Sequence, residues 1–499
     1  MSFKKFFNSK NKNVIDVLVL WTSQFATVGL AFFIQLILAR VLDIKDYGSF
    51  TSALNIVTIL GSIAAFGAGS NWLRAFGTEG WKAYGWIRPT IKINIVLFIG
   101  ITSCLLISIN YIHIADNTKL LIIMFISILL SLTFSTSAEA VYQLEEAYKK
   151  LAILKFLVQG FRFVVVVLAL LISSNLFFIA TGYTISSIIL TCIYFFIIKR
   201  LYIGKVNLKG HKDNQLNVKV PDNKMKKTFK YLSPYGSTIL FYSIYFQSNI
   251  FIIGVMLGEE NVALYNVAFT ILNVIYLFPT TFYQSYLIPK IHRWGENDKE
   301  KISLLFKDGS KVVIVLSVLI VVGIILCSPF IVPLLFGSKY QDSSMILILL
   351  AVTIPFRLLC NNLGSILVTE KHVVKKAYYQ MIGAIISVIL NISLINIWGL
   401  YGAAFATIIT ELIVMLLFVY GVNRYVSGVK RFSENELMQY SLLLFIITAM
   451  TFCCFYAIWS NYEYLISILI SCILGLILII LILKILRRDL IPSIKKLLF

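Results

Sequence analysis

Three charged residues lie in the middle of apolar runs that are long enough to cross a membrane. Arg162 stands in LVQGFRFVVVV, Arg357 follows Pro355 in AVTIPFRLLC, and Glu411 stands in ATIITELIVM. A charge at the centre of a bilayer costs roughly 2.5–3.5 kcal/mol on insertion scales, so such residues are candidates for function. The arginines fit an anionic cargo, because a guanidinium group binds phosphate oxygens through two parallel hydrogen bonds.

A structural interpretation of the same residues stays open. Glu411 and one arginine would then form an ion pair that joins two helices. Arg40 and Asn249 are further candidates. Arg40 fits either the mouth of a cavity or a membrane interface, and Asn249 would hydrogen-bond either a polar cargo or a neighbouring helix. The predicted binding and translocation residues are therefore Arg162, Arg357, Glu411, Arg40 and Asn249.

No residue pattern predicts an enzyme. The seven cysteines lie in apolar runs without a CxxC spacing, and the four histidines form neither an HxxH nor an HExxH motif, so no metal site is predicted. The sequence has no GxxxxGK[ST] loop, and we expect no cofactor and no direct use of ATP. The net charge of +21 would suit nucleic acid if the basic residues formed one soluble face, but they are spread along the chain.

The elements that carry these residues must be membrane-spanning helices. Hydrophobic residues make up 59% of the 499 residues and charged residues only 13%, with a mean hydropathy of +0.87. Such a composition cannot supply a water-soluble surface. Apolar windows of about 20 residues recur from end to end, which predicts an all-α integral membrane protein of about fourteen transmembrane helices.

The fourteen windows are separated by charges, Gly, Pro and Asn. They run approximately over Val14–Leu38, Tyr47–Leu73, Arg88–His113, Thr118–Ala140, Lys150–Ile172, Asn175–Lys199, Tyr231–Leu257, Val262–Pro289, Asp308–Phe336, Ser343–Val368, Lys376–Ile397, Leu400–Arg424, Met438–Trp459 and Tyr462–Leu486. We expect a kink at Pro355, because proline removes a backbone hydrogen bond from a helix.

The distribution of Lys and Arg predicts the topology. With both termini in the cytoplasm, 35 of the 44 basic residues fall in inner segments and only four in outer loops. The tendency of basic residues to remain on the cytoplasmic side favours this arrangement, and one helix more or fewer would destroy the alternation.

Two related segments predict a repeat. LDIKDYGSFTSALN begins at Leu42, and LGEENVALYNVAFT begins 215 residues later at Leu257. Six helices separate the copies, so both enter the membrane in the same direction, as in transporters with parallel repeats. We predict two six-helix lobes in a pseudo-twofold repeat, residues 1–199 and 231–424, joined by a basic cytoplasmic linker at 200–230. Residues 425–499 would add two helices and a cytoplasmic tail.

Three stretches resemble the polysaccharide-exporting branch of the multidrug/oligosaccharidyl-lipid/polysaccharide exporter superfamily. They are QLILARVLDIKDYGSFTSALNIV from Gln35, YLSPYGSTILFYSIYFQSNIFIIGVMLGEENVALYNVAF from Tyr231, and GAIISVILNISLINIWGLYGAAFATIITE from Gly383. Their order and spacing and the helix count fit nearly the whole chain.

The resemblance implies a bacterial inner-membrane flippase. Such a protein moves a polyprenyl-diphosphate-linked oligosaccharide, an O-antigen or capsular repeat unit, from the cytoplasmic to the outer leaflet by alternating access. A polysaccharide polymerase and a chain-length regulator are the implied protein partners. Many members carry an acidic residue where this chain has Asn249, which puts cation coupling through that position in doubt.

Three other functions remain as alternatives. A cation-coupled multidrug antiporter of the same superfamily would favour acidic and aromatic cavity groups over paired arginines. A membrane glycosyltransferase or polymerase would need a carboxylate cluster and a large outer loop, and the sequence shows neither. A non-transporting scaffold of a polysaccharide assembly complex is compatible with the sequence.

Overall fold

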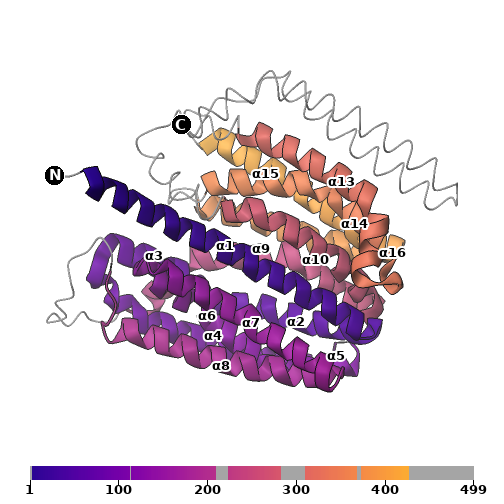
Figure 1. Cartoon of the computed structure of the whole chain (residues 1–499), viewed down its shortest axis with the longest axis horizontal. Coiled ribbons are helices and arrows are strands. Elements are labelled where there is room, and N and C mark those ends of the chain that lie inside the picture. Colours follow the sequence, from indigo (N-terminus) through magenta and orange to yellow (C-terminus); the bar gives the residue numbers. More distant parts are fainter. Residues whose placement is uncertain (1–2, 113, 209–222, 283–308, 368–372, 426–499) are drawn as a thin grey trace. The chain divides into compact units, whose positions relative to one another are not determined.

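A computed structural model describes residues 3–112, 114–208, 223–282, 309–367 and 373–425 (Figure 1). Within these ranges the secondary structure consists of α-helices and short 3-10 helices, without a β-strand. The chain divides into two compact units, Met1–Ala263 and Leu264–Phe499. The two predicted C-terminal helices and the middle of the predicted linker lie outside the described residues.

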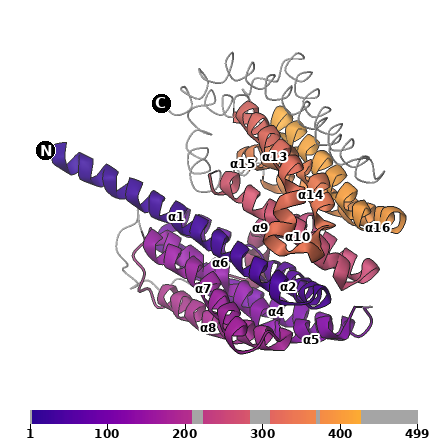
Figure 2. The same cartoon turned by 45° about the vertical axis from the view of Figure 1, so that its right-hand side comes forward.

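The first unit is built around one central helix, α6. It packs against α2, α3 and α8, while α1 lies along α7. In both views α4, α6, α7 and α8 run side by side with roughly aligned axes (Figures 1 and 2). The elements are α1 (Phe3–Val41), α2 (Ile44–Ala65), α3 (Ala68–Glu79), the 3-10 helix η1 (Gly80–Trp86), α4 (Ile87–Ser108), α5 (Asp116–Met124), α6 (Ile126–Leu144), α7 (Tyr148–Ile172), α8 (Leu176–Tyr202) and α9 (Met225–Leu257).

The second unit contains a bundle in which α15 packs against α13 and α16. Its longest helix, α16, bends at Gly399, where φ is 57° and ψ is −134°, so its two limbs are separate segments. The elements are most of α10 (Glu259–Phe282), α13 (Ser310–Phe336), η4 (Ser338–Tyr340), α14 (Ser343–Ala351), α15 (Thr353–Ile366) and α16 (Val373–Tyr425).

Where their residues are described, the first twelve predicted spans fall on these helices, which confirms the all-α membrane fold. Within the described residues, seven helices are long and apolar enough to cross a membrane, or up to nine when two bent pairs count as single spans. The total of fourteen stays a prediction. Helix α9, predicted to begin the second lobe, packs against α2, α3 and α4 and belongs to the first unit. The predicted lobe boundaries likewise stay a prediction.

Two spans predicted as continuous are broken. The fourth bends by 45° between α5 and α6, and the second is divided into α2 and α3.

The tenth span, for which a proline kink was predicted, bends by 45° between α14 and α15 at Val352. This break lies three residues before Pro355, which therefore occupies the first turn of α15, where no backbone N–H is needed. The predicted proline kink is confirmed, and its position is corrected by these three residues.

The break in the second span depends on a close helix contact. Phe66 and Gly67 have φ values of 40° and 72°, in the left-handed region. A side chain on Gly67 would place its Cβ 2.8 Å from the Cβ of Tyr235, so α9 passes too close for any residue but glycine. The Asn94 amide donates to the carbonyl oxygens of Ala64 and Ala65 at 2.8 and 2.9 Å. These bonds satisfy the carbonyls that the end of α2 leaves without helical partners.

The loops of the first unit gather at two ends with different charge. At one end Asn223 N donates to Gly85 O at 2.9 Å, and Arg200 pairs with Glu145 at 2.7 Å. This basic end also carries Lys82, Arg88, Lys149, Lys150, Lys199, Lys205 and Lys224. The opposite end holds the α1–α2, α4–α5 and α9–α10 turns. In this unit, the loops that the sequence predicts to be rich in Lys and Arg therefore lie together at one end, and the loops predicted to be poor in them lie at the other.

The first residues of the two predicted repeat segments meet within the first unit, at its less basic end. Lys45 and Glu260, at equivalent repeat positions, form an exposed ion pair with 3.4 Å between Nζ and Oε1. A Cβ on Gly48 would overlap the carbonyl of Glu259, so the α1–α2 turn touches backbone of the α9–α10 turn. Glu259 Oε1 also accepts hydrogen bonds from Thr118 Oγ1 at 2.8 Å and from Ala115 N at 3.1 Å. Small residues permit this approach, as they do between membrane helices generally.

Candidate functional site: a buried charge cluster in the second unit

Arg357 and Glu411 form a buried ion pair between α15 and the second limb of α16. Arg357 Nη1 donates to Glu411 Oε1 at 3.0 Å, and the two side chains are only 4% and 3% exposed. Among the described residues, no donor reaches the second carboxylate oxygen, Glu411 Oε2. A pair held away from solvent is costly to form and more costly to break, because removal of one partner strands the other charge.

A second cation lies beside this pair. Lys376, on the first limb of α16, donates from Nζ to the carbonyl oxygen of Gly364 on α15 at 3.2 Å. Arg357, Cys360 and Gly364 recur at helical spacing and so share one face of α15. Cys360 lies within electrostatic range of Arg357, Glu411 and Lys376, which places all four groups in one neighbourhood. Two cations and one carboxylate therefore lie in this part of the unit, and the hydrogen bond to the carboxylate comes from Arg357.

Hydrogen-bonded hydroxyl groups extend the polar character of this interior. The hydroxyl of Tyr276 bonds that of Thr353 at 2.7 Å, and the hydroxyl of Tyr265 bonds that of Thr407 at 3.0 Å. Asn362 Nδ2 donates to Ser310 Oγ at 2.9 Å. Buried polar groups in a membrane protein are expensive unless they are satisfied, so a cluster of this size is a candidate for function.

The remaining predicted site residues lie in the first unit. Arg162, on α7, is half-buried with its guanidinium carbon 5.3 Å from the ring centre of Tyr183 on α8. Arg40 is exposed in the last turn of α1, and Asn249 is only 1% exposed on α9. The structure thus brings Arg357 together with Glu411. The functional roles of Arg162, Arg40 and Asn249 stay predictions.

Sequence reasoning assigned Lys376 to the inner loop and missed its position in the cluster. The signal that could have found it is a stripe of small and polar residues at helical spacing, Gln380, Gly383, Ser387 and Asn391, all buried. Lys376 lies four residues before Gln380 and continues this stripe, whereas its neighbour Lys375 points elsewhere on the helix.

Comparison with known families decides the classification. The family model described as polysaccharide biosynthesis protein matches residues 14–294, more than half of the chain. The chain belongs to this family. A second model, MatE, matches residues 235–393. Members of these families are transporters of the multidrug/oligosaccharidyl-lipid/polysaccharide exporter superfamily, and the chain is a multi-pass membrane transporter of that superfamily.

Individual relatives agree with the family assignment. The chain is 25% identical over 193 residues to the probable low-salt glycan biosynthesis flippase Agl15 of Haloferax volcanii. This alignment covers 38% of the chain and only 41% of the archaeal protein. The fold is similar to that of the lipid II flippase MurJ in an inward closed conformation, with a TM-score of 0.67, 16% identity, and coverage of 95% and 100% of the two chains.

An outward-facing multidrug resistance transporter of the MATE family is also similar in fold. Its TM-score is 0.55 at 14% identity, with coverage of 86% of this chain and 96% of that protein. At these identities both structural likenesses concern the fold alone. Together they agree with the all-helical transporter architecture and leave the cargo to be argued from the residues.

Proposed function

We propose that this protein is a flippase for a polyprenyl-diphosphate-linked oligosaccharide, an O-antigen or capsular repeat unit, carried from the cytoplasmic to the outer leaflet of a bacterial inner membrane. The observation that carries the proposal is the cluster formed by the buried Arg357–Glu411 pair and the half-buried Lys376, which donates to the Gly364 carbonyl beside that pair. Its net positive charge suits the diphosphate of such a cargo. Membership in the polysaccharide biosynthesis family supports a glycan cargo.

The cluster would act through exchange of partners. When the diphosphate enters, Arg357 turns part of its planar donor set from Glu411 to the phosphate oxygens, and Lys376 adds a point charge. Hydroxyl groups such as Tyr276 and Thr353 would hydrogen-bond the sugars while the prenyl chain stays in lipid. Outward movement of an anion gains roughly 2.3 kcal/mol per charge per 100 mV across an inside-negative membrane. The membrane potential thus provides a driving force without ATP.

A second candidate function is a cation-coupled multidrug antiporter. Two observations favour it: the MatE match over residues 235–393, and the buried Glu411 Oε2, which no described residue bonds. A carboxylate in this position is chemically able to take up a proton or a metal cation. In an antiporter, Arg357 would lower the affinity of Glu411 for cations. The presence of Arg357 therefore favours the flippase over the antiporter.

The deciding experiment follows lipid-linked intermediates in cells depleted of the protein. Mass spectrometry would identify the lipid-linked oligosaccharide, and a leaflet-specific probe would locate it. The flippase predicts accumulation of a completed repeat unit on prenyl diphosphate in the inner leaflet. Normal turnover of that lipid, in cells without another flippase, together with new drug sensitivity would establish the antiporter instead.

A further inference from the structure

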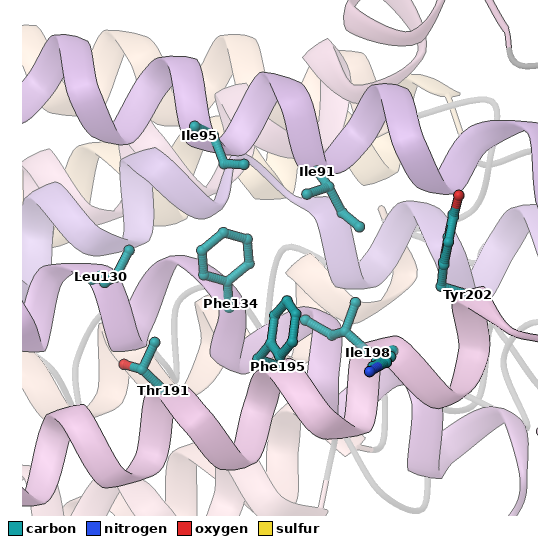
Figure 3. Close-up of a pocket in the computed structure, with 9 residues that line it drawn as sticks. Ile91, Ile95, Leu130, Phe134, Thr191, Phe195, Ile198 and Tyr202 are labelled. Carbon is teal, nitrogen blue, oxygen red and sulfur yellow. The ribbon is translucent and has the colours of Figure 1, made fainter.

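An apolar groove of about 620 Å³ lies along the first unit between α4, α6 and α8 (Figure 3). Helix α6 forms its floor through Leu130 and Phe134, because α6 packs against both neighbours. The walls are open to the surroundings: Ile95 on α4 is 41% exposed and Phe195 on α8 is 63% exposed. Such a surface faces lipid in a membrane protein, and a lipid chain is its natural occupant.

The length of the groove corresponds to one leaflet. On α8 the lining runs from Thr191 to Tyr202, which at 1.5 Å per residue spans about 16 Å. One leaflet contributes roughly 15 Å, half of the hydrocarbon core. An acyl chain would therefore fill the groove from the membrane surface to the midplane. A polyprenyl chain is far longer than this groove and fits it poorly.

Only one end of the groove is charged. Lys199 and Tyr202 line that end, and Arg88 lies three residues before Ile91 on the same face of α4. Arg88 donates to the hydroxyl of Tyr202, and its guanidinium carbon lies 5.0 Å from the ring centre. Both Arg88 and Lys199 are exposed at the basic end of the unit. Two cations at the mouth of a leaflet-length apolar groove match the charge and shape of an anionic phospholipid.

We infer that the groove binds one anionic phospholipid from the leaflet at the basic end. Its phosphate lies against Arg88 and Lys199, and an acyl chain lies along Ile95, Phe134 and Phe195. The site is separate from the charge cluster of the second unit and does not depend on the identity of the transported cargo. Because the lipid contacts three helices at once, it would hold α4 and α8 against α6.

Native mass spectrometry of the purified full-length protein, titrated with phosphatidylglycerol or phosphatidylcholine, tests this site. The charge variant is Arg88→Gln/Lys199→Gln, and the groove variant is Ile95→Trp, which fills the acyl site. Lys149→Gln/Lys150→Gln removes two exposed charges on α7 at the same end and serves as the matched control. Each cation strengthens binding of an anionic lipid about fivefold, so the charge variant should bind phosphatidylglycerol about 30-fold more weakly.

The control should bind phosphatidylglycerol as the wild type does, and Ile95→Trp should weaken the binding of both phosphatidylglycerol and phosphatidylcholine. Equal losses in the charge variant and the control, or unchanged binding by Ile95→Trp, would overturn the site. Preference for undecaprenyl phosphate over phosphatidylglycerol would overturn the choice of lipid. Thermal unfolding without lipid reports the fold of each variant. If the charge variant unfolds early, the Ile95→Trp result decides alone.

Discussion

Paired replacement of Arg357 and Glu411 separates a transport role from a structural one. With 3.0 Å between Nη1 and Oε1 and both side chains buried, their attraction is about 5 kcal/mol at an effective dielectric constant near 20. Either single change, Arg357→Met or Glu411→Leu, leaves one buried charge stranded. We expect each to lower the free energy of unfolding by about 3–5 kcal/mol. The double variant replaces the pair with apolar side chains of similar size and should recover most of that stability.

Two measurements on each variant complete the test. Unfolding of the purified protein gives stability, and the leaflet distribution of lipid-linked oligosaccharide in depleted cells gives transport. We expect the double variant to be stable and inactive, because an apolar pair cannot bind a diphosphate. A double variant that is stable and fully active would refute the transport role and show that the pair serves only to join α15 to α16. The matched control is Lys155 with Glu139, whose side chains are about 30% exposed at 3.4 Å and whose replacement should change stability by less than about 1 kcal/mol.

Three further perturbations test other parts of the molecule. A Cβ on Gly254 would lie 3.3 Å from Ser52 Oγ, which is close to the roughly 3 Å between a Cβ and the far sulfur atom in a disulfide. In a protein whose seven native cysteines are replaced, Ser52→Cys/Gly254→Cys should therefore crosslink α2 to α9. Transport should stop on oxidation and return on reduction if α2 and α9 must separate, and an active oxidised form would contradict alternating access at this contact. Gly67→Ala should destabilise the protein by at least about 1–2 kcal/mol in thermal unfolding, because φ is 72° and the new methyl group meets Tyr235. Gly77→Ala is the control, since a Cβ on Gly77 meets open space and should leave stability unchanged. Equal stability of the two variants would argue against the close α9 contact. Arg162→Lys should retain more transport than Arg162→Ala if its charge serves the cargo, and wild-type transport by both would remove Arg162 from the site.

The helices and their order could be predicted because the cause is local. A run of about 20 apolar residues must span lipid as a helix, since no water is present to satisfy its backbone. The same reasoning places the bend at Gly399 between two predicted spans and a kink close to Pro355. The breaks at Phe66 and Phe125 escaped prediction. The first depends on α9 passing Gly67 and on Asn94 bonding the end of α2, contacts that no window of the sequence contains.

The candidate site divides in the same way. The residue types and their place in apolar runs identified Arg357 and Glu411 as charges that are unfavourable in a membrane and therefore as candidate site residues. Only the tertiary structure decided that these two residues, 54 positions apart in the chain, pair with each other, and that Lys376 joins them. Partner choice depends on how helices rotate and approach, which side-chain packing across the whole unit determines. The sequence by itself thus determined the membrane helices and the candidate charges, and the packing of the helices decided which charges meet.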